Sequence, residues 1–145
     1  MPYPKLLHQV AIISHDEKKV SSSEAHRLIH TSPLYNNRPQ RAKDNLKLLL
    51  DAFYAHDWAS AYAISWREFQ DMHSLFSTSN PPFTYMTDAS TELLSKVQKL
   101  WQQCEDGPIV TMDAGPNVHL LYRPDQAQLA QEFKLKYLVG NYDIL

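Results

Sequence analysis

The chain has 145 residues, of which 43% are hydrophobic and 21% are charged, a composition typical of a globular domain. Fourteen Lys and Arg against sixteen Asp and Glu give a net charge of −2, which disfavours a nucleic-acid partner. The single cysteine excludes an internal disulfide and a cysteine-based zinc site, and three glycines exclude a Gly-rich phosphate loop. Because no apolar run is long enough for a membrane span, we expect a cytoplasmic protein.

The first part of the chain predicts one strand and one short helix. Residues 6–14 are apolar and β-branched towards their end, as in a buried strand. Ser21 and Glu24 have the spacing of a capping box, which predicts a helix that continues to about residue 30. The charged stretch at residues 17–19 is interpreted as an exposed turn without a binding role.

Three longer helices are predicted in the middle of the chain. Residues 40–56 place apolar side chains at helical spacing, which predicts one buried stripe. Its members are Leu46, Leu49, Leu50, Phe53 and Tyr54. Asp57 caps a second helix that ends near residue 76. The third helix covers residues 88–104, and Cys104 on its apolar face is predicted to be a buried structural thiol.

The last third of the chain changes character. Residues 109–112 and 118–122 are predicted strands on either side of a tight Asp-Ala-Gly-Pro-Asn turn. A helix over residues 124–136 follows, and residues 137–139 are predicted as a final short strand. Strands at both ends with helices between them indicate an α+β domain over residues 1–145, an antiparallel sheet covered by helices.

The serine triplet at residues 21–23 is the first candidate site. Free amides at a helix N-terminus together with hydroxyl groups can bind an anion. The same serines can instead do no more than cap the helix, and the sequence leaves both interpretations open.

Asp113, at the end of a predicted strand, is the second candidate. A carboxylate presented on a loop can serve as a general base for a hydroxyl group. The alternative is a turn aspartate that bonds its own backbone. Among the histidines, His26 and His30 are four residues apart, but the metalloprotease signature is absent and no metal site is predicted. His73 is expected to be a packed histidine.

Five motifs, in order, resemble the C-terminal half of the diphosphomevalonate decarboxylases, a family of the GHMP kinase superfamily. The family motifs close to VSSTxGM, ETSPL, DSNxFHA, FPPIxYLND and FDAGPNA are similar to residues 20–26, 30–34, 68–74, 80–88 and 112–118. The resemblance implies the sandwich fold of the GHMP kinase C-terminal domain. It also implies that the N-terminal ATP-binding half of the family lies outside this chain.

The resemblance further implies a reaction. Family members are carbon–carbon lyases that use ATP and Mg²⁺ to convert mevalonate 5-diphosphate to isopentenyl diphosphate in the isoprenoid pathway. The aspartate of the DAGPN motif is the family's base for the 3-hydroxyl group, which implies this role for Asp113. A serine of the VSST motif contacts substrate phosphate, which implies Ser21 or Ser22. The partners so implied are mevalonate diphosphate, the missing N-terminal half and a possible second copy of the chain.

Several residues depart from the family motifs. Ala25 and His26 replace a glycine and a methionine, and Glu68, Phe69 and Gln70 replace an aspartate, a serine and an asparagine. We expect these changes to alter substrate fit. A related mevalonate-phosphate kinase or decarboxylase is therefore an alternative, as is a non-catalytic binding or dimerisation module that keeps the fold. The isolated chain is expected to be inactive.

Overall fold

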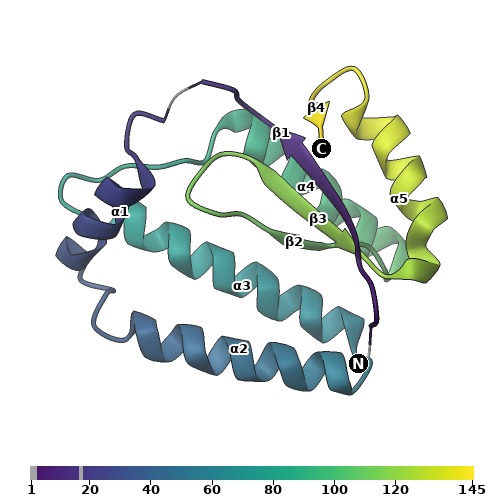
Figure 1. Cartoon of the computed structure of the whole chain (residues 1–145), viewed down its shortest axis with the longest axis horizontal. Coiled ribbons are helices and arrows are strands. Elements are labelled where there is room, and N and C mark those ends of the chain that lie inside the picture. The colour runs from purple at the N-terminus through teal and green to yellow at the C-terminus, as the bar shows by residue number, and fades with distance from the viewer. Residues whose placement is uncertain (1–2, 17) are drawn as a thin grey trace.

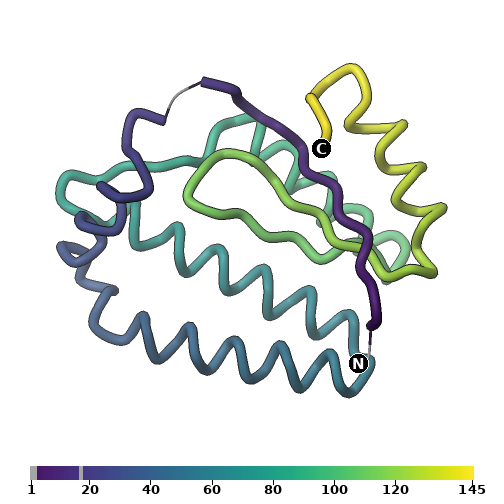
Figure 2. The backbone as a smooth tube through the Cα atoms, viewed as in Figure 1, coloured from purple at the N-terminus to yellow at the C-terminus, as the bar shows by residue number. Residues whose placement is uncertain are grey.

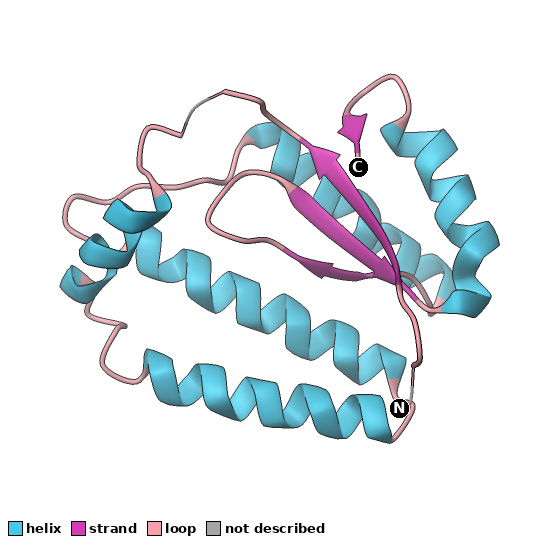
Figure 3. Ribbon diagram, viewed as in Figure 1, coloured by secondary structure: helices cyan, strands magenta, loops and turns pink. Residues whose placement is uncertain are grey.

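The computed structural model describes residues 3–16 and 18–145 and contains one sheet with helices packed on one face and along one edge (Figures 1 and 3). The strands are β1 (Leu7–Ile12), β2 (Ile109–Thr111), β3 (Val118–Tyr122) and β4 (Asp143–Ile144). Their order is β2-β3-β1-β4, and all neighbours are antiparallel. The predicted α+β class is confirmed.

The helices begin where the sequence supplies caps. The helices are α1 (Ser22–Leu28), α2 (Arg38–Tyr54), α3 (Trp58–Ser77), α4 (Asp88–Cys104) and α5 (Ala127–Phe133). Side chains of Ser21, Asp57 and Thr87 accept hydrogen bonds from the first turns of α1, α3 and α4, which satisfies amides that have no partner within the helix. No helix in the described part of the chain is both long and apolar enough to cross a bilayer.

One face of the sheet carries the main core. Ala11, Val110, Val118, Leu120 and Tyr122 are completely buried there. They pack against apolar side chains of α4 and α5, with Leu93, Val97 and Phe133 among them. The strict alternation along β3, in which residues 118, 120 and 122 are buried, fixes the register of the central strands.

The opposite face is only partly covered. α3 runs along the edge strand β2, and α2 packs on α3 as an outer layer (Figure 1). Ile109 and Leu121 contact this helical pair, whereas His8 at the start of β1 is exposed. The β2–β3 loop extends towards α1 (Figure 2), so segments far apart in the sequence meet at one end of the sheet.

The apolar stripe predicted for residues 40–56 is only partly buried, since Leu49 and Phe53 pack against the core cluster around Ile109 and the other three members do not. Leu46, Leu50 and Tyr54 are 57%, 46% and 71% exposed. α2 instead buries Asn45 and Ala52, because it rests on α3 rather than on the sheet. Leu46 borders a groove of about 390 Å³ that also contacts Thr111 and Leu121.

Two smaller predictions are also corrected. Cys104 is exposed, because α4 ends there and the next residue, Glu105, turns the chain in a left-handed conformation. Residues 137–139 form no strand, since Leu138 is buried in a π-helical turn. The last strand is β4, and the amide of Leu145 extends its pairing with a hydrogen bond to the carbonyl oxygen of Val10.

Candidate functional site

A single lysine joins the two candidate loops. Lys18 Nζ donates one hydrogen bond to Ser22 Oγ and another to the carbonyl oxygen of Ala114, both at 2.9 Å. The same ammonium lies 5.6 Å from the centre of the Tyr85 ring, within reach of a cation–π contact. The sequence did not indicate these contacts of Lys18, which is exposed as expected for residues 17–19, while Glu17 lies outside the described residues.

The two serines have different surroundings. Ser21 Oγ accepts a hydrogen bond from the Glu24 amide at 3.1 Å, so this hydroxyl caps α1. Ser22 Oγ faces Lys18. Tyr85 donates its hydroxyl proton to the carbonyl oxygen of Val20 at 2.6 Å and so anchors the segment that precedes both serines. The capping interpretation describes Ser21, whereas Ser22 lies beside a positive charge.

The Asp113 loop is held by contacts that do not involve the Asp113 carboxylate. Asn117 Oδ1 accepts from the Ile13 amide at 2.8 Å, and Ser90 Oγ donates to the carbonyl oxygen of Pro116 at 2.8 Å. The Asp113 side chain is 73% exposed, and its one side-chain neighbour among the ion pairs of the described residues is His119. A β-carbon at Gly115 would lie 3.2 Å from Asp113 Oδ1, so glycine there keeps space for the carboxylate.

His73 also holds this loop, through the backbone of Asp113. Its Nε2 lies 2.9 Å from the carbonyl oxygen of Asp113, and only 7% of the residue is exposed. Burial lowers the pKa of His73, against a smaller raising effect of Asp113. The neutral ring therefore donates its Nε2 proton to that carbonyl oxygen, while the buried Nδ1 has no partner among the described residues. The expectation of a packed histidine is confirmed.

This burial predicts acid sensitivity. The unfolded chain protonates His73 near its ordinary pKa of 6.5, whereas the folded chain resists protonation until a lower pH. The free energy of unfolding is unaffected above this range and falls as the pH drops below 6.5, by at most about 1.4 kcal/mol per pH unit from this residue. Urea unfolding between pH 7.5 and 5 measures the slope. His73→Gln should reduce it, and the exposed-residue control His26→Gln should not; equal slopes in all three proteins would contradict the prediction.

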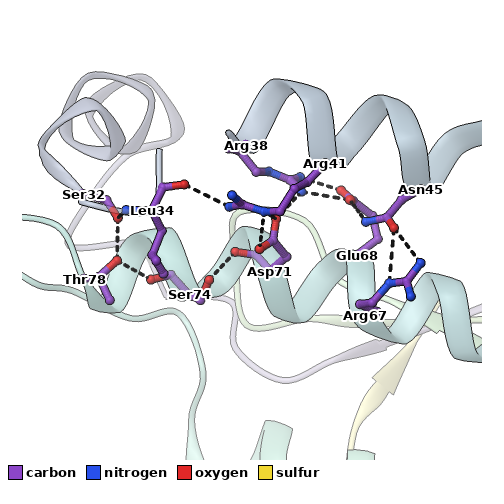
Figure 4. A network of polar contacts seen from close by, with 10 residues as sticks. All are labelled: Ser32, Leu34, Arg38, Arg41, Asn45, Arg67, Glu68, Asp71, Ser74 and Thr78. Atoms are coloured by element: carbon purple, nitrogen blue, oxygen red, sulfur yellow. Dashed lines mark hydrogen bonds and ion pairs between the residues drawn. The ribbon is translucent and has the colours of Figure 1, made fainter. Parts of the chain in front are cut away.

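An ion-pair network locks α2 onto α3 behind the site (Figure 4). The Arg38 guanidinium donates to both Glu68 and Asp71, and Asn45 also donates to Glu68. Burial would raise the pKa of Glu68, but these hydrogen bonds and the charge of Arg38 outweigh it and lower the pKa. Glu68 thus binds α2, and Phe69, 1% exposed, belongs to the core. Two of the departures from the family motif therefore make structural contacts.

Replacement of Arg38 by methionine should destabilise the domain, because Glu68 loses its only ion-pair partner among the described residues and Asp71 keeps only Arg41. We expect the free energy of unfolding to fall by about 1–3 kcal/mol, below the value for a fully buried pair. The control is Arg27→Met, which breaks the exposed pair with Glu24 and should cost at most about 1 kcal/mol. Chemical denaturation compares the two variants. An equal loss in both would show that the network adds no more than a surface pair.

A mostly apolar cavity of about 380 Å³ adjoins the two loops. It opens between α1 and the α2–α3 pair, and Ser22, Ala114, Met72 and Phe76 contribute to its walls. The site therefore combines an ammonium, a hydroxyl and an exposed carboxylate beside an apolar wall. This set can bind an anionic group and accept a proton.

The donor set does not form a metal centre. Within residues 3–16 and 18–145, no group of three or more His, Cys, Asp or Glu side chains is placed to hold a metal ion. The described residues therefore do not enclose a metal ion with protein ligands alone.

The sheet order, the helical layers and the DAGPN loop define an α+β domain of the GHMP kinase C-terminal type. A family model described as the mevalonate 5-diphosphate decarboxylase C-terminal domain matches residues 9–142. The chain belongs to this family, as the five motifs predicted.

Known relatives agree with this assignment. The chain is 28% identical over 141 residues to a diphosphomevalonate decarboxylase of Candida albicans, covering 93% of this chain and 37% of that protein. A crystal structure of a mevalonate diphosphate decarboxylase from Legionella pneumophila is 58% identical, with a TM-score of 0.95. That match covers 99% of this chain and 46% of the Legionella chain. The chain thus spans less than half the length of these relatives.

Ligand-bound structures also share the fold. A structure of MDDEF in complex with MVAPP is 25% identical, has a TM-score of 0.81, and matches 94% of this chain and 43% of its own. Another MDDEF complex, with MVAPP, AMPPCP and magnesium, is 24% identical with a TM-score of 0.82 and covers 97% of this chain and 42% of its own; that likeness shows the fold alone.

Proposed function

We propose that this chain is the C-terminal part of an ATP-dependent decarboxylase that converts mevalonate 5-diphosphate to isopentenyl diphosphate. The observation that carries the proposal is the Asp113 carboxylate, 73% exposed on a loop whose backbone is held from several elements. Lys18 ties this loop to the serine that follows the α1 cap. Family membership supplies the reaction class, and the geometry supplies the groups that carry it.

Asp113 acts as the base for the 3-hydroxyl group. An alcohol attacks a phosphoryl group poorly unless its proton is accepted as the new bond forms. The O–H bond breaks with its proton going to the Asp113 carboxylate, while the oxygen bonds to the γ-phosphorus of ATP and ADP leaves. The C–O bond to the new phosphate then breaks, and loss of carbon dioxide supplies the electron pair of the alkene.

Lys18 and Ser22 bind the substrate's phosphate groups. The Lys18 ammonium has three N–H donors. Two of them already donate hydrogen bonds to Ser22 Oγ and to the Ala114 carbonyl oxygen. A charged donor beside a hydroxyl is well suited to a phosphate oxygen. The substrate is thereby held next to the loop that carries Asp113.

The proposed reaction also needs the region of the relatives that this chain does not match. This chain covers 46% of the Legionella relative and contains no Gly-rich phosphate loop. ATP and Mg²⁺ are therefore bound mainly by an N-terminal half, and the isolated chain turns over nothing. The test is a chimera in which this chain replaces the matching part of the Legionella protein. Carbon dioxide release from mevalonate diphosphate is expected from the chimera and not from the chain alone.

Substitutions of Ser21 and Ser22 should have different effects in this chimera. Ser21→Ala removes the helix cap and should lower the free energy of unfolding by about 1 kcal/mol, with little change in KM. Ser22→Ala should leave stability intact and raise the KM for mevalonate diphosphate. Thermal unfolding and steady-state kinetics measure both quantities. The reverse pattern would assign the phosphate contact to Ser21.

A non-catalytic dimerisation module is the second candidate, and one observation favours it. Leu46, Leu50 and Tyr54 lie exposed at helical spacing along α2. If this face pairs with a second copy, the isolated chain sediments as a dimer. Leu50→Glu should then dissociate the dimer into monomers. An inactive, folded chimera together with such a dimer would favour this function over the decarboxylase.

A further inference from the structure

Two histidines, His8 and His119, form a line of contacts across the open face of the sheet to Asp113. His8 on β1 and His119 on β3 lie on the same face, because Val10, two residues after His8, is the direct partner of His119. Their rings are stacked with centres 5.3 Å apart, and His8 Nε2 lies 3.1 Å from His119 Nδ1. The other nitrogen of His119, Nε2, lies 3.8 Å from Asp113 Oδ2.

The contacts favour one arrangement of protons. A neutral imidazole carries one N–H proton. If His8 donates from Nε2 to His119 Nδ1, the N–H proton of a neutral His119 is on Nε2, where it faces the Asp113 carboxylate. The opposite direction would place the His119 lone pair against a negative charge. Partial burial and, secondarily, the charge of His119 lower the pKa of His8, which keeps His8 neutral and able to fix the tautomer.

We propose that His119 is a positioning residue for Asp113, and that His8 holds His119 in the tautomer that presents Nε2–H to the carboxylate. This inference rests on the proposed function. The Asp113 side chain is exposed, so a small rotation closes the 3.8 Å separation to a hydrogen bond. That bond would orient the carboxylate towards the substrate hydroxyl.

The other charged groups near this line are already engaged. Thr111, the neighbour of His119 on β2, does not titrate. From α3, Glu68 borders the same face but is paired with Arg38, and His73 contacts only the backbone of Asp113. Lys18 reaches the next carbonyl oxygen, at Ala114. His119 is thus the titratable side chain that contacts the carboxylate itself among the described residues.

The first test needs no activity and uses the full chain. Long-range ¹H–¹⁵N NMR spectra distinguish the two tautomers of each ring. We expect His119 to carry its proton on Nε2, and His8→Phe to convert it to a mixture. The matched control is His15→Gln, which removes another histidine–carboxylate contact of the sheet, with Asp143, and should leave His119 unchanged. A proton on Nδ1 of His119, or no response to His8→Phe, would overturn the inference.

The second test uses the chimera and separates positioning from packing. His119→Leu should lower kcat by about tenfold, less than the ~10²-fold or more expected for loss of the base itself, and leave KM within about twofold. His119→Gln, whose amide can donate to the carboxylate, should recover part of kcat. An unchanged kcat in His119→Leu, with Asp113→Asn inactive, would refute the positioning role alone. Full activity in Asp113→Asn would instead refute the role of Asp113 as the base, on which this inference rests.

Discussion

Replacement of Asp113 by asparagine in the chimera should lower kcat by at least ~10²-fold, because the amide has the size of the carboxylate but cannot accept the hydroxyl proton. The fold should be unchanged, since the loop is held by its backbone through His73, Asn117 and Ser90. Steady-state kinetics and thermal unfolding measure the two effects.

The control for this variant is Asp51→Asn, which neutralises an exposed carboxylate of α2. Its kcat should equal that of the parent chimera. If Asp113→Asn also retained a near-normal kcat, the proton of the 3-hydroxyl group would have another acceptor, and the exposed carboxylate would be an ordinary turn aspartate.

Replacement of Lys18 by methionine is expected to have the second largest effect. Methionine keeps an unbranched side chain but removes the ammonium that joins Ser22 Oγ to the Ala114 carbonyl oxygen. A hydrogen bond to a charged group contributes about 1.5–3 kcal/mol, so the KM for mevalonate diphosphate should rise roughly 10- to 100-fold. Because the bridge also sets the position of the Asp113 loop, kcat should fall as well.

Lys47→Met serves as the matched control, since Lys47 is an exposed lysine of α2. Its KM should stay at the parent value in the same assay. Equal values for Lys18→Met and the parent would remove Lys18 from substrate binding and leave it as a link between two loops. Raising the ionic strength should weaken binding in the parent more than in Lys18→Met.

Local signals in the sequence identified much of the fold and the two candidate loops. The capping box at Ser21 and the DAGPN turn are defined by residues within a few positions of one another, so a single sequence shows them. The main helices and three of the four strands follow from periodicity and breakers in the same way. The alternation of β3 is strong because one face of that strand is completely buried.

Features that depend on distant pairing were missed. Lys18 meets Ala114 across 96 positions, and His8 meets His119 across 111, so no local pattern could indicate either contact. The last strand was misplaced because β4 exists only through its pairing with β1. The register of β1 with β3, which places His119 opposite Val10 and diagonally from His8, has no local signal in the sequence either.

The leucines of α2 illustrate a different limit of prediction from the sequence. Periodicity reveals that a helix has an apolar face, but not which layer of the fold covers that face. α2 is an outer helix that packs on α3 and is tied to it by an ion-pair network, so Leu46 and Leu50 remain exposed. The spacing of these leucines in the sequence is the same as the spacing of leucines in a buried stripe.

The most direct test of the central claim is carbon dioxide release from mevalonate 5-diphosphate by the chimera with the Legionella N-terminal half, with ATP and Mg²⁺ present. The 58% identity of the matched region makes a folded chimera the expected product. Release of carbon dioxide with equimolar ADP and phosphate, abolished by Asp113→Asn, is the predicted result. A folded chimera that releases none, while the parent Legionella enzyme is active in the same assay, would contradict the assignment of a decarboxylase half to this chain.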